Sequence, residues 1–194
     1  LMINDPRFSP AGVLAPKSKA DLAFTMHMLS WLSTSGTAAI VEFPGVLYRG
    51  GAEAKIRKYL IDNNYVDAVI QLPPDLFFGT TIATCIVVLK KSKKDNKTLF
   101  IDASAEFVRG GNKNKFSDEN RKKILNAFIE RKDAEYFAKL VDNKTISEND
   151  YNLAISSYVT QKDTREVVDI KELNTEIARI VARQNELRTA IDKI

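Results

Sequence analysis

Three short apolar runs limit what this chain can fold into more than any other feature of the sequence. They are TAAIVEFP (residues 37–44), VDAVIQLP (66–73) and ATCIVVLKK (83–91). An amphipathic segment, AEAKIRKYLIDNN (52–64), separates the first two runs. Continuous apolar strands joined by a helix are typical of a parallel sheet that is covered on both faces. The sequence therefore predicts an α/β fold.

The third run is expected to lie antiparallel to the second. The link between them holds about ten residues and no helical pattern, whereas a parallel crossover needs a dozen or more. A fourth strand is predicted at TLFIDAS, residues 98–104.

Helices are predicted on either side of these strands. Ser18 and Asp21 have the spacing of a capping box, so a helix is expected to begin there and to continue to about Ser33. Its apolar residues fall on two opposite sides, which is typical of a helix buried between layers. They are Leu22, Met26 and Leu29 on one side and Phe24, Met28 and Trp31 on the other.

Further helices are expected after the fourth strand. One should begin at Ser117, with Asp118 and Glu119 in a first turn that favours acidic residues. Its buried stripe is predicted to be Ile124, Leu125, Phe128 and Ile129. A short helix is expected near residues 133–141, and an extended segment at 151–155.

The last thirty residues follow a heptad pattern. The a positions are Ile170, Ile177, Gln184 and Ile191, and the d positions are Leu173, Ile180, Leu187 and Ile194. A helix with such a narrow apolar stripe needs a partner helix, and a polar residue at an a position helps to fix register. A docking helix is favoured over one that folds back on its own domain, because the stripe stays narrow. The predicted domains are residues 1–110, an extension at 111–164 and the docking helix at 165–194.

Composition and charge narrow the classes of function. The net charge is +4, but residues 90–123 hold eleven Lys or Arg against five Asp or Glu. This basic segment allows contact with nucleic acid, although a solvated surface is the more economical interpretation. The single cysteine, and the lack of a signal peptide or an apolar run long enough for a membrane span, favour a cytoplasmic protein with no membrane partner.

Most catalytic motifs fail when they are read residue by residue. GVLYRGGA (45–52) lacks the lysine and the hydroxyl of a phosphate-binding loop. His27 is the only histidine and Cys85 the only cysteine, so no usual metal site can be assembled, and both are expected to be structural.

The motif LPPDLFF (72–78) has the paired prolines of the catalytic loop of amino-methylating DNA methyltransferases. That loop needs a polar residue before the prolines to accept hydrogen bonds from the target amine. Here the position holds Leu72, and Asp75 replaces the aromatic residue that should follow. The chain is therefore not expected to be a complete enzyme.

In spite of this, an ordered set of segments resembles the C-terminal half of the modification subunit of type I restriction–modification systems, an adenine-N6 DNA methyltransferase. The segments are NDPRFSPAGVLAPKSKADLAF, FPGVLYRGGAEAKIRKYLIDNNYVDAVIQLPPDLFFGTTIATCIVVLKK, LFIDAS and NDYNLAISSYV. The resemblance implies a doubly wound methyltransferase sheet, of which the three apolar runs would be strands 5, 6 and antiparallel 7. The S-adenosylmethionine loop and the Asn-Pro-Pro-Phe loop of the family would lie upstream. The piece alone is therefore expected to be inactive and to bind no cofactor tightly.

The resemblance also suggests site residues and partners. Phe77, Phe78 and Gly79 would lie in the loop that approaches the flipped adenine, although both phenylalanines could equally be core anchors. Arg49, Lys113 and Lys115 are candidates for contacts with DNA phosphates. The expected partners are DNA and the specificity and restriction subunits, and the tail would dock on the specificity subunit. Self-association is also expected, through the tail or through the edge of strand 37–43, which would lack a neighbour.

Overall fold

The computed structural model describes residues 2–162 and 170–192. Contacts divide the chain into two compact units, Leu1–Gln161 and Lys162–Ile194. The predicted boundary between residues 110 and 111 lies inside the first unit, whereas the one between 164 and 165 falls outside the described residues.

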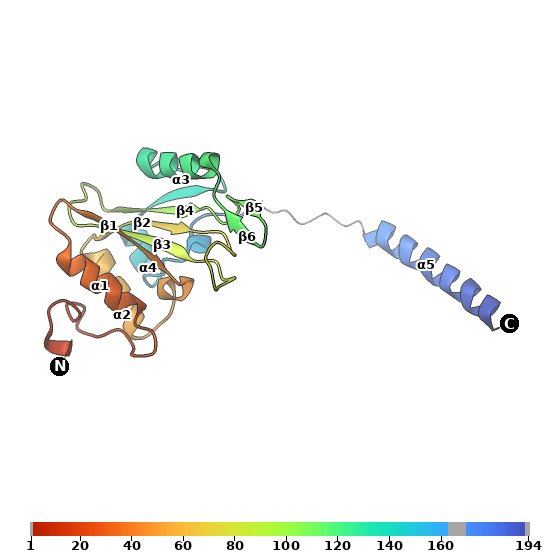
Figure 1. Ribbon diagram of the computed structural model, residues 1–194, viewed down its shortest axis with the longest axis horizontal. Helices are drawn as coiled ribbons and strands as arrows, with labels where there is room; N and C mark the ends of the chain where they lie inside the picture. The colour runs from red at the N-terminus through yellow and green to blue at the C-terminus, as the bar shows by residue number, and fades with distance from the viewer. Residues whose placement is uncertain (1, 163–169, 193–194) are drawn as a thin grey trace. The chain divides into compact units, whose positions relative to one another are not determined.

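The first unit is built on a five-stranded sheet of order β1-β3-β2-β4-β7 (Figure 1). The strands are β1 (Thr37–Glu42), β2 (Val66–Gln71), β3 (Cys85–Lys90), β4 (Lys97–Asp102) and β7 (Ala138–Asp142). β3 lies between β1 and β2 and runs antiparallel to both, which is the direction that the short linker predicts. β2 and β4 are parallel, and β7 is antiparallel to β4.

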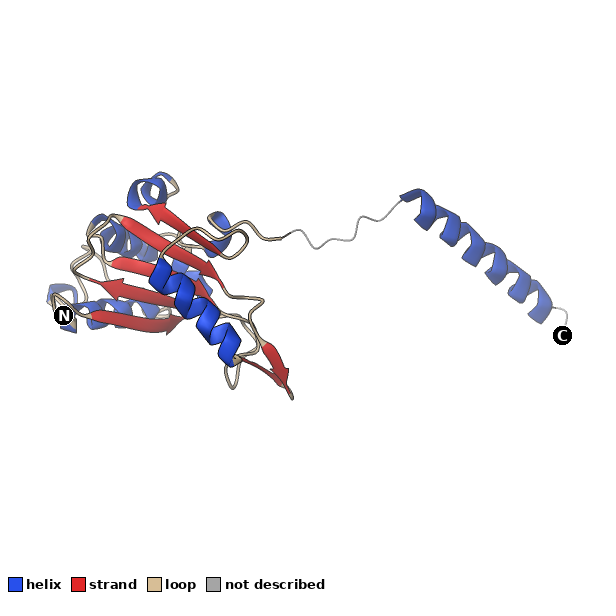
Figure 2. Ribbon diagram, turned by 90° about the horizontal axis from the view of Figure 1, so that it is seen from above, coloured by secondary structure: helices blue, strands red, loops and turns tan. Residues whose placement is uncertain are grey.

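Helices cover both faces of this sheet (Figures 1 and 2). α1 (Asp21–Trp31), α2 (Ala52–Asp62) and α4 (Asn143–Glu148) contribute Met26, Ile56 and Ile146 to the core on one face. On the other face, α3 (Asp118–Glu130) packs against a second core of alternate strand residues. Side chains alternate between the two faces of a strand, so Val69 joins the first core and Ile70 the second. The prediction of helices on both faces is confirmed. The predicted parallel sheet is not found, because β3 separates β1 from β2 and only β2 and β4 pair in parallel among the described strands of this sheet.

The predicted first helix needs two corrections. α1 begins at Asp21, and its N-cap is Ala20, without a side-chain hydrogen bond, so the capping box at Ser18 is not formed. Its second apolar side is not covered: Phe24 is 64% exposed and Trp31 is 76% exposed. The helix packs on the sheet through one side only, and the expectation of burial between two layers is wrong for the described residues.

The segment after α3 also differs from the prediction. Residues 138–142 form strand β7 and not a helix, because pairing with β4 satisfies the backbone there. α4 begins only at Asn143, after Asp142, which accepts a 2.8 Å hydrogen bond from the backbone N–H of Thr145. The segment predicted to be extended, 151–155, belongs to no described strand: Tyr151 has a φ of 54°, and a 3-10 turn, Ile155–Ser157, begins at its last residue.

α3 begins where it was predicted. The hydroxyl of Ser117 accepts a hydrogen bond from the backbone N–H of Asn120, whose side chain accepts one from the backbone of Ser117. Ile124 and Phe128 pack on the sheet, as predicted. Leu125 and Ile129 are exposed, so that half of the predicted stripe is wrong.

Two smaller features frame the candidate site. Strands β5 (Val108–Gly110) and β6 (Lys113–Lys115) form a hairpin beyond β4. β1 is an edge strand with β3 as its one partner, and Val41 is 48% exposed. The expectation that both faces of the sheet are covered is therefore wrong at β1, where alternate residues are exposed. The unpaired edge that was expected is present among the described residues.

The described part of the second unit holds one helix, α5 (Ile170–Ile191), and every side chain described in it is exposed. Its length is about 33 Å at the α-helical rise of roughly 1.5 Å per residue. The heptad positions from Ile170 to Ile191 all lie within it. Ile194 and residues 165–169 of the predicted docking helix are outside the described residues. No helix in the described part of the chain is long and apolar enough to cross a membrane.

Candidate functional site

The loop of residues 72–84 leaves the sheet at the carboxyl end of β2 and returns as β3. Its two ends are held together, because the N–H of Leu72 and the side-chain amide of Gln71 both donate to the carbonyl oxygen of Thr84, at 2.9 Å and 3.0 Å. The end of β1 lies beside it, since Glu42 pairs with Cys85. Ligands of open α/β sheets bind outside the carboxyl ends of parallel strands, so this loop has the position of a site.

Two residues give the loop its tight turns. Asp75 has a φ of 55° and Gly79 a φ of 80°. A φ of this sign is strained for most residues and is free for glycine, so Gly79 supplies a turn that another residue would resist. The N–H of Asp75 donates to the carbonyl of Thr81 across the loop.

Phe77 and Phe78 both project from the core. Phe78 is 100% exposed and Phe77 is 38% exposed. The interpretation of both as core anchors is therefore wrong for Phe78. Ile82, in the same loop, is also exposed, so the loop presents apolar side chains at the carboxyl end of the sheet.

The β5–β6 hairpin holds the loop through Asn114, whose side chain is buried. Its backbone N–H donates to the carbonyl of Asp75 at 3.0 Å, and its amide nitrogen donates to the carbonyl of Pro74 at 2.8 Å. The amide oxygen of Asn114 accepts from Arg109, which also lies 3.4 Å from the carboxylate of Asp75. Sequence reasoning missed this clamp, because nothing local marks Asn114 as different from Asn112.

The predicted phosphate contacts lie in three different settings. Lys113 belongs to the clamp: its Nζ donates to the carbonyl of Thr80 at 3.0 Å and lies 3.6 Å from the carboxylate of Asp75. Lys115 is exposed and has no ion pair among the described residues.

Arg49 turns back toward its own helix. Its Nη1 lies 3.3 Å from the carboxylate of buried Glu53, and its guanidinium lies against Gly45. A Cβ at Gly45 would lie 2.2 Å from Arg49 Cζ, so only glycine leaves room for this arrangement.

Cys85 and His27 have structural surroundings. Cys85 is fully buried, and burial raises the pKa of its thiol to about 12. The ring of His27 lies 5.5 Å from that of Phe8 and 4.6 Å from that of Trp31. The part of the chain that the structure describes holds no group of three His, Cys, Asp or Glu side chains that could bind a metal ion.

The sheet, the loop and the clamp define an α/β domain with an aromatic loop at the carboxyl end of its strands. The sequence pattern of the family described as N-6 DNA Methylase matches residues 1–167, and the chain therefore belongs to this family.

Relatives with similar sequences are subunits of type I restriction enzymes. The MpnII methylase subunit of Mycoplasma pneumoniae is 51% identical over 194 residues, which are 100% of this chain and 36% of that protein. The MjaVIII methylase subunit of Methanocaldococcus jannaschii is 38% identical over 170 residues, covering 84% of this chain and 29% of the relative.

A solved structure is similar as well. The crystal structure of a type I restriction–modification system methyltransferase subunit from Streptococcus thermophilus superposes with a TM-score of 0.80 and 49% identity. The match covers 81% of this chain and 34% of that one. The chain thus spans about a third of the length of the proteins that it resembles.

Proposed function

We propose that the chain is part of the modification subunit of a type I restriction–modification system, which transfers a methyl group from S-adenosylmethionine to N6 of adenine in DNA. The observation that carries the proposal is the 51% identity over the whole chain to a type I methylase subunit. We propose the cytoplasm as the place of this reaction.

The arrangement of the first three strands supports a position within the methyltransferase sheet. β3 runs antiparallel between β1 and β2. We assign β1, β2 and β3 to strands 5, 6 and 7 of a doubly wound sheet, whose last strand is inserted in this way. The free edge of β1 would then face strand 4 of the complete subunit.

In this assignment the loop of residues 72–84 is one wall of the pocket for the flipped adenine. An enzyme that acts on a base must move the base out of the stack, and aromatic side chains then hold it. Phe77 and Phe78 are suited to this because they project from the core at the correct end of the sheet. Exposed Lys115, and Arg49 after a change of rotamer, are candidates for contacts with the DNA backbone.

Methyl transfer itself would need residues outside this chain. Leu72 precedes the paired prolines and has no side-chain acceptor for the adenine amine. The sequence contains no GxGxxG motif for the cofactor. S-adenosylmethionine is therefore proposed for the complete subunit, and tight binding by these 194 residues alone is not expected.

Titration calorimetry tests this division of labour. Addition of S-adenosylmethionine to the 194-residue chain should release no heat of binding, whereas the complete subunit should bind the cofactor. Micromolar binding to the chain alone would show that its residues form the cofactor site and would overturn the proposal.

The second candidate function is assembly. α5 exposes its heptad residues along its length, including Ile177, Ile180 and Leu187, and a stripe of this kind is suited to a coiled coil. We propose that it docks on the specificity subunit, and that the restriction subunit joins the same complex.

The docking proposal has a matched pair of variants. Ile177→Ser with Ile180→Ser should abolish binding to the specificity subunit in pull-down or interferometry. Ala178→Ser with Ala182→Ser changes the same helix outside the a and d positions and should leave binding intact. Equal binding by both variants would exclude docking through the heptad stripe.

A further inference from the structure

A cavity with a basic lining lies at the opposite end of the sheet from the loop of residues 72–84. It forms where β1 begins and β3 ends, since Thr37 pairs with Lys90, and it has a volume of about 560 Å³. β3 runs from Cys85 to Lys90, so the Cα atoms at its two ends lie about 17 Å apart, at roughly 3.4 Å for each of the five steps between them. This cavity is therefore distinct from the candidate functional site.

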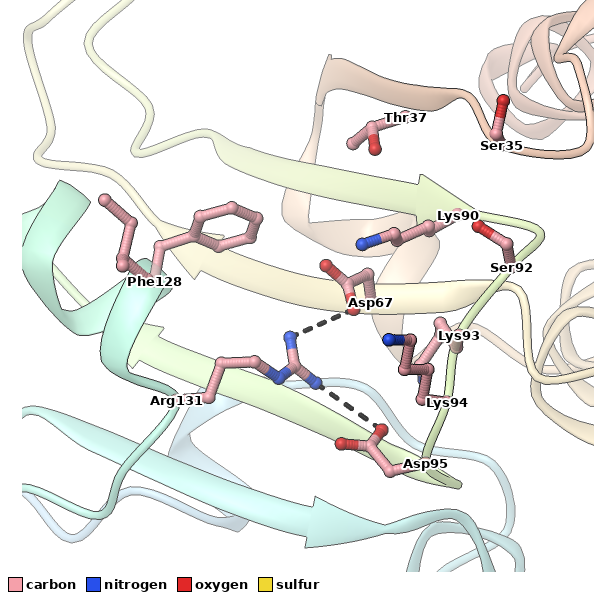
Figure 3. A pocket seen from close by; sticks show the side chains of 11 residues that line it. Ser35, Thr37, Asp67, Lys90, Ser92, Lys93, Lys94, Asp95, Phe128 and Arg131 are labelled. Carbon is pink, nitrogen blue, oxygen red and sulfur yellow. Dashed lines mark hydrogen bonds and ion pairs between the residues drawn. The ribbon is translucent and has the colours of Figure 1, made fainter.

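Cations outnumber anions around this cavity. Its positively charged lining residues are Lys90, Lys93, Lys94 and Arg131, and its negatively charged lining residues are Asp67 and Asp95. Figure 3 shows Lys90, Asp67 and Arg131 pointing toward one another from three different elements. The lining carries a net charge of +2 at neutral pH when every lysine is protonated, and attracts an anion.

Arg131 contacts both acidic residues of the lining. Its Nη1 lies 2.9 Å from the carboxylate of buried Asp67, and its Nη2 lies 3.8 Å from that of Asp95. Arg131 is the residue that ends α3, with a φ of 50°, so the turn of the chain directs its side chain into the cavity. Because this one cation serves both carboxylates, the lysines are not all needed to balance them.

Lys93 is held at the wall of the cavity. Its Nζ donates a 2.6 Å hydrogen bond to the carbonyl of Val66, the first residue of β2. Burial lowers the pKa of Lys93 to about 8, although Asp67 and Asp95 raise it, and Arg131 lowers it further. An anion in the cavity would favour the charged form of this ammonium group.

Lys90 and Lys94 are available for a ligand. Neither has an ion pair or a hydrogen bond from its ammonium group among the described residues, and both line the cavity. The hydroxyl groups of Ser35, Thr37 and Ser92 are further donors in the same lining. Several ammonium and hydroxyl donors around one space suit a phosphate group, which accepts hydrogen bonds in several directions.

One wall of the cavity is apolar. Phe128 and Ile129, from the last turn of α3, form it. The volume is larger than a phosphate ion needs, and an aromatic ring beside cations suits a flat base attached to the phosphate.

We propose that this cavity binds a nucleotide unit through its phosphate group, either as a free mononucleotide or within a strand of DNA. The inference goes beyond the proposed function, because a phosphate site at this end of the sheet has no part in methyl transfer. Its test is also independent of methyl transfer, because nucleotide binding can be measured on the 194-residue chain.

The test is an NMR titration at constant ionic strength with inorganic phosphate, thymidine monophosphate and a short single-stranded oligonucleotide. We expect the mononucleotide to shift the amide signals of residues 92–95 and to bind more tightly than inorganic phosphate. The oligonucleotide distinguishes the two sources. If it shifts the same signals, the site takes DNA, and if only the mononucleotide does, the site takes a free nucleotide.

The variants are chosen so that the fold survives. Lys90→Gln with Lys94→Gln removes two ammonium groups and should weaken mononucleotide binding by about tenfold or more, because the phosphate loses two charged donors. Lys122→Gln with Lys144→Gln makes the same change of charge away from the cavity and should leave binding within about twofold. Ile129→Ser should remove the preference for the mononucleotide over inorganic phosphate.

Two results would overturn the proposal. One is the absence of any shift at residues 92–95 with all three probes. The other is equal loss of affinity in the two lysine pairs, which would indicate binding to surface charge alone.

Discussion

The Nε of Arg57 donates a 2.9 Å hydrogen bond to the carbonyl oxygen of Tyr151, 94 residues further along the chain. The same guanidinium donates from Nη1 to the carbonyl of Val46 at 3.0 Å, and Arg57 is only 2% exposed. Burial lowers the pKa of Arg57, and the carboxylate of Glu53 raises it. One buried cation thus joins α2 to the turn before it and to the segment after α4.

Arg57→Ala should therefore destabilise the first unit by about 2–4 kcal/mol, because a buried and a part-buried carbonyl group lose their donor and a cavity is left. Urea unfolding followed by circular dichroism measures the loss. Lys55→Ala, on the exposed side of the same helix, should change the free energy of unfolding by less than about 0.5 kcal/mol. A similar small effect for Arg57→Ala would contradict the inference that its hydrogen bonds hold these segments together.

The clamp at Asn114 predicts where the candidate loop becomes mobile. Asn114→Ala removes the donor to the carbonyl of Pro74, so hydrogen exchange of residues 75–82 should accelerate. The cost in stability should be about 1–3 kcal/mol. Asn112 lies in the turn of the same hairpin, and Asn112→Ala keeps the backbone carbonyl that Arg109 contacts. Hydrogen exchange of residues 75–82 in this variant should therefore match that of the unchanged protein. Unchanged exchange in Asn114→Ala would show that the loop keeps its shape without the clamp.

A substitution of Phe78 should change the proposed capture of the base without changing the stability of the fold. Because its side chain is fully exposed, Phe78→Ala should leave the melting temperature unchanged. In the complete subunit it should weaken the capture of the flipped adenine by about tenfold, as expected for loss of a stacking contact of roughly 1–3 kcal/mol. DNA with 2-aminopurine at the target position reports base flipping by fluorescence. Ile82→Ala is the matched apolar control, and an equal effect of the two variants would argue against a specific stacking role.

The thiol of Cys85 should report unfolding. Its pKa is about 12 against an ordinary value of 9.0, so an aromatic disulfide reagent at pH 8 should label it only after denaturation. The unfolded thiol loses its proton at a lower pH than the folded one. The contribution of this group to stability should therefore fall as the pH rises above about 9. Rapid labelling of the native chain would contradict the burial of Cys85.

The free edge of β1 predicts concentration-dependent association of this chain. Val41→Lys places a charge on the edge strand and should suppress that association, as lysines do at natural sheet edges. Sedimentation velocity at several concentrations measures it. Glu135→Gln, on an exposed loop of the same unit, raises the net charge by the same one unit and should leave the association intact. A chain that is monomeric throughout would exclude pairing through this edge.

Predictions from the sequence succeeded where the signal is local. The strand at 66–71 follows from an unbroken apolar run, the direction of β3 from the length of one linker, and the start of α3 from Ser117 and its first turn. They failed where distant residues decide the outcome. β7 is a strand because β4 lies beside it, and the sequence of residues 133–142 alone does not indicate that pairing.

The same distinction applies to the candidate site. The loop with Phe77, Phe78 and Gly79 could be located from its own sequence, and the turn at Gly79 is as expected. Its partner Asn114 lies 40 residues from Pro74, so the clamp appears only when the chain is folded. The exposure of Trp31 and Phe24 was not predicted either. An apolar pattern on a helix does not show whether another element covers that side of the helix.

The proposed methyl transfer is tested by the product that the complete subunit makes in the presence of the proposed specificity subunit. Unmethylated DNA is incubated with labelled S-adenosylmethionine, digested to nucleosides and analysed by mass spectrometry. We predict label in N6-methyladenine, reduced by Phe78→Ala and not by Ile82→Ala. Label in methylcytosine, or no label in DNA although both subunits are folded and bind the cofactor, would contradict the account.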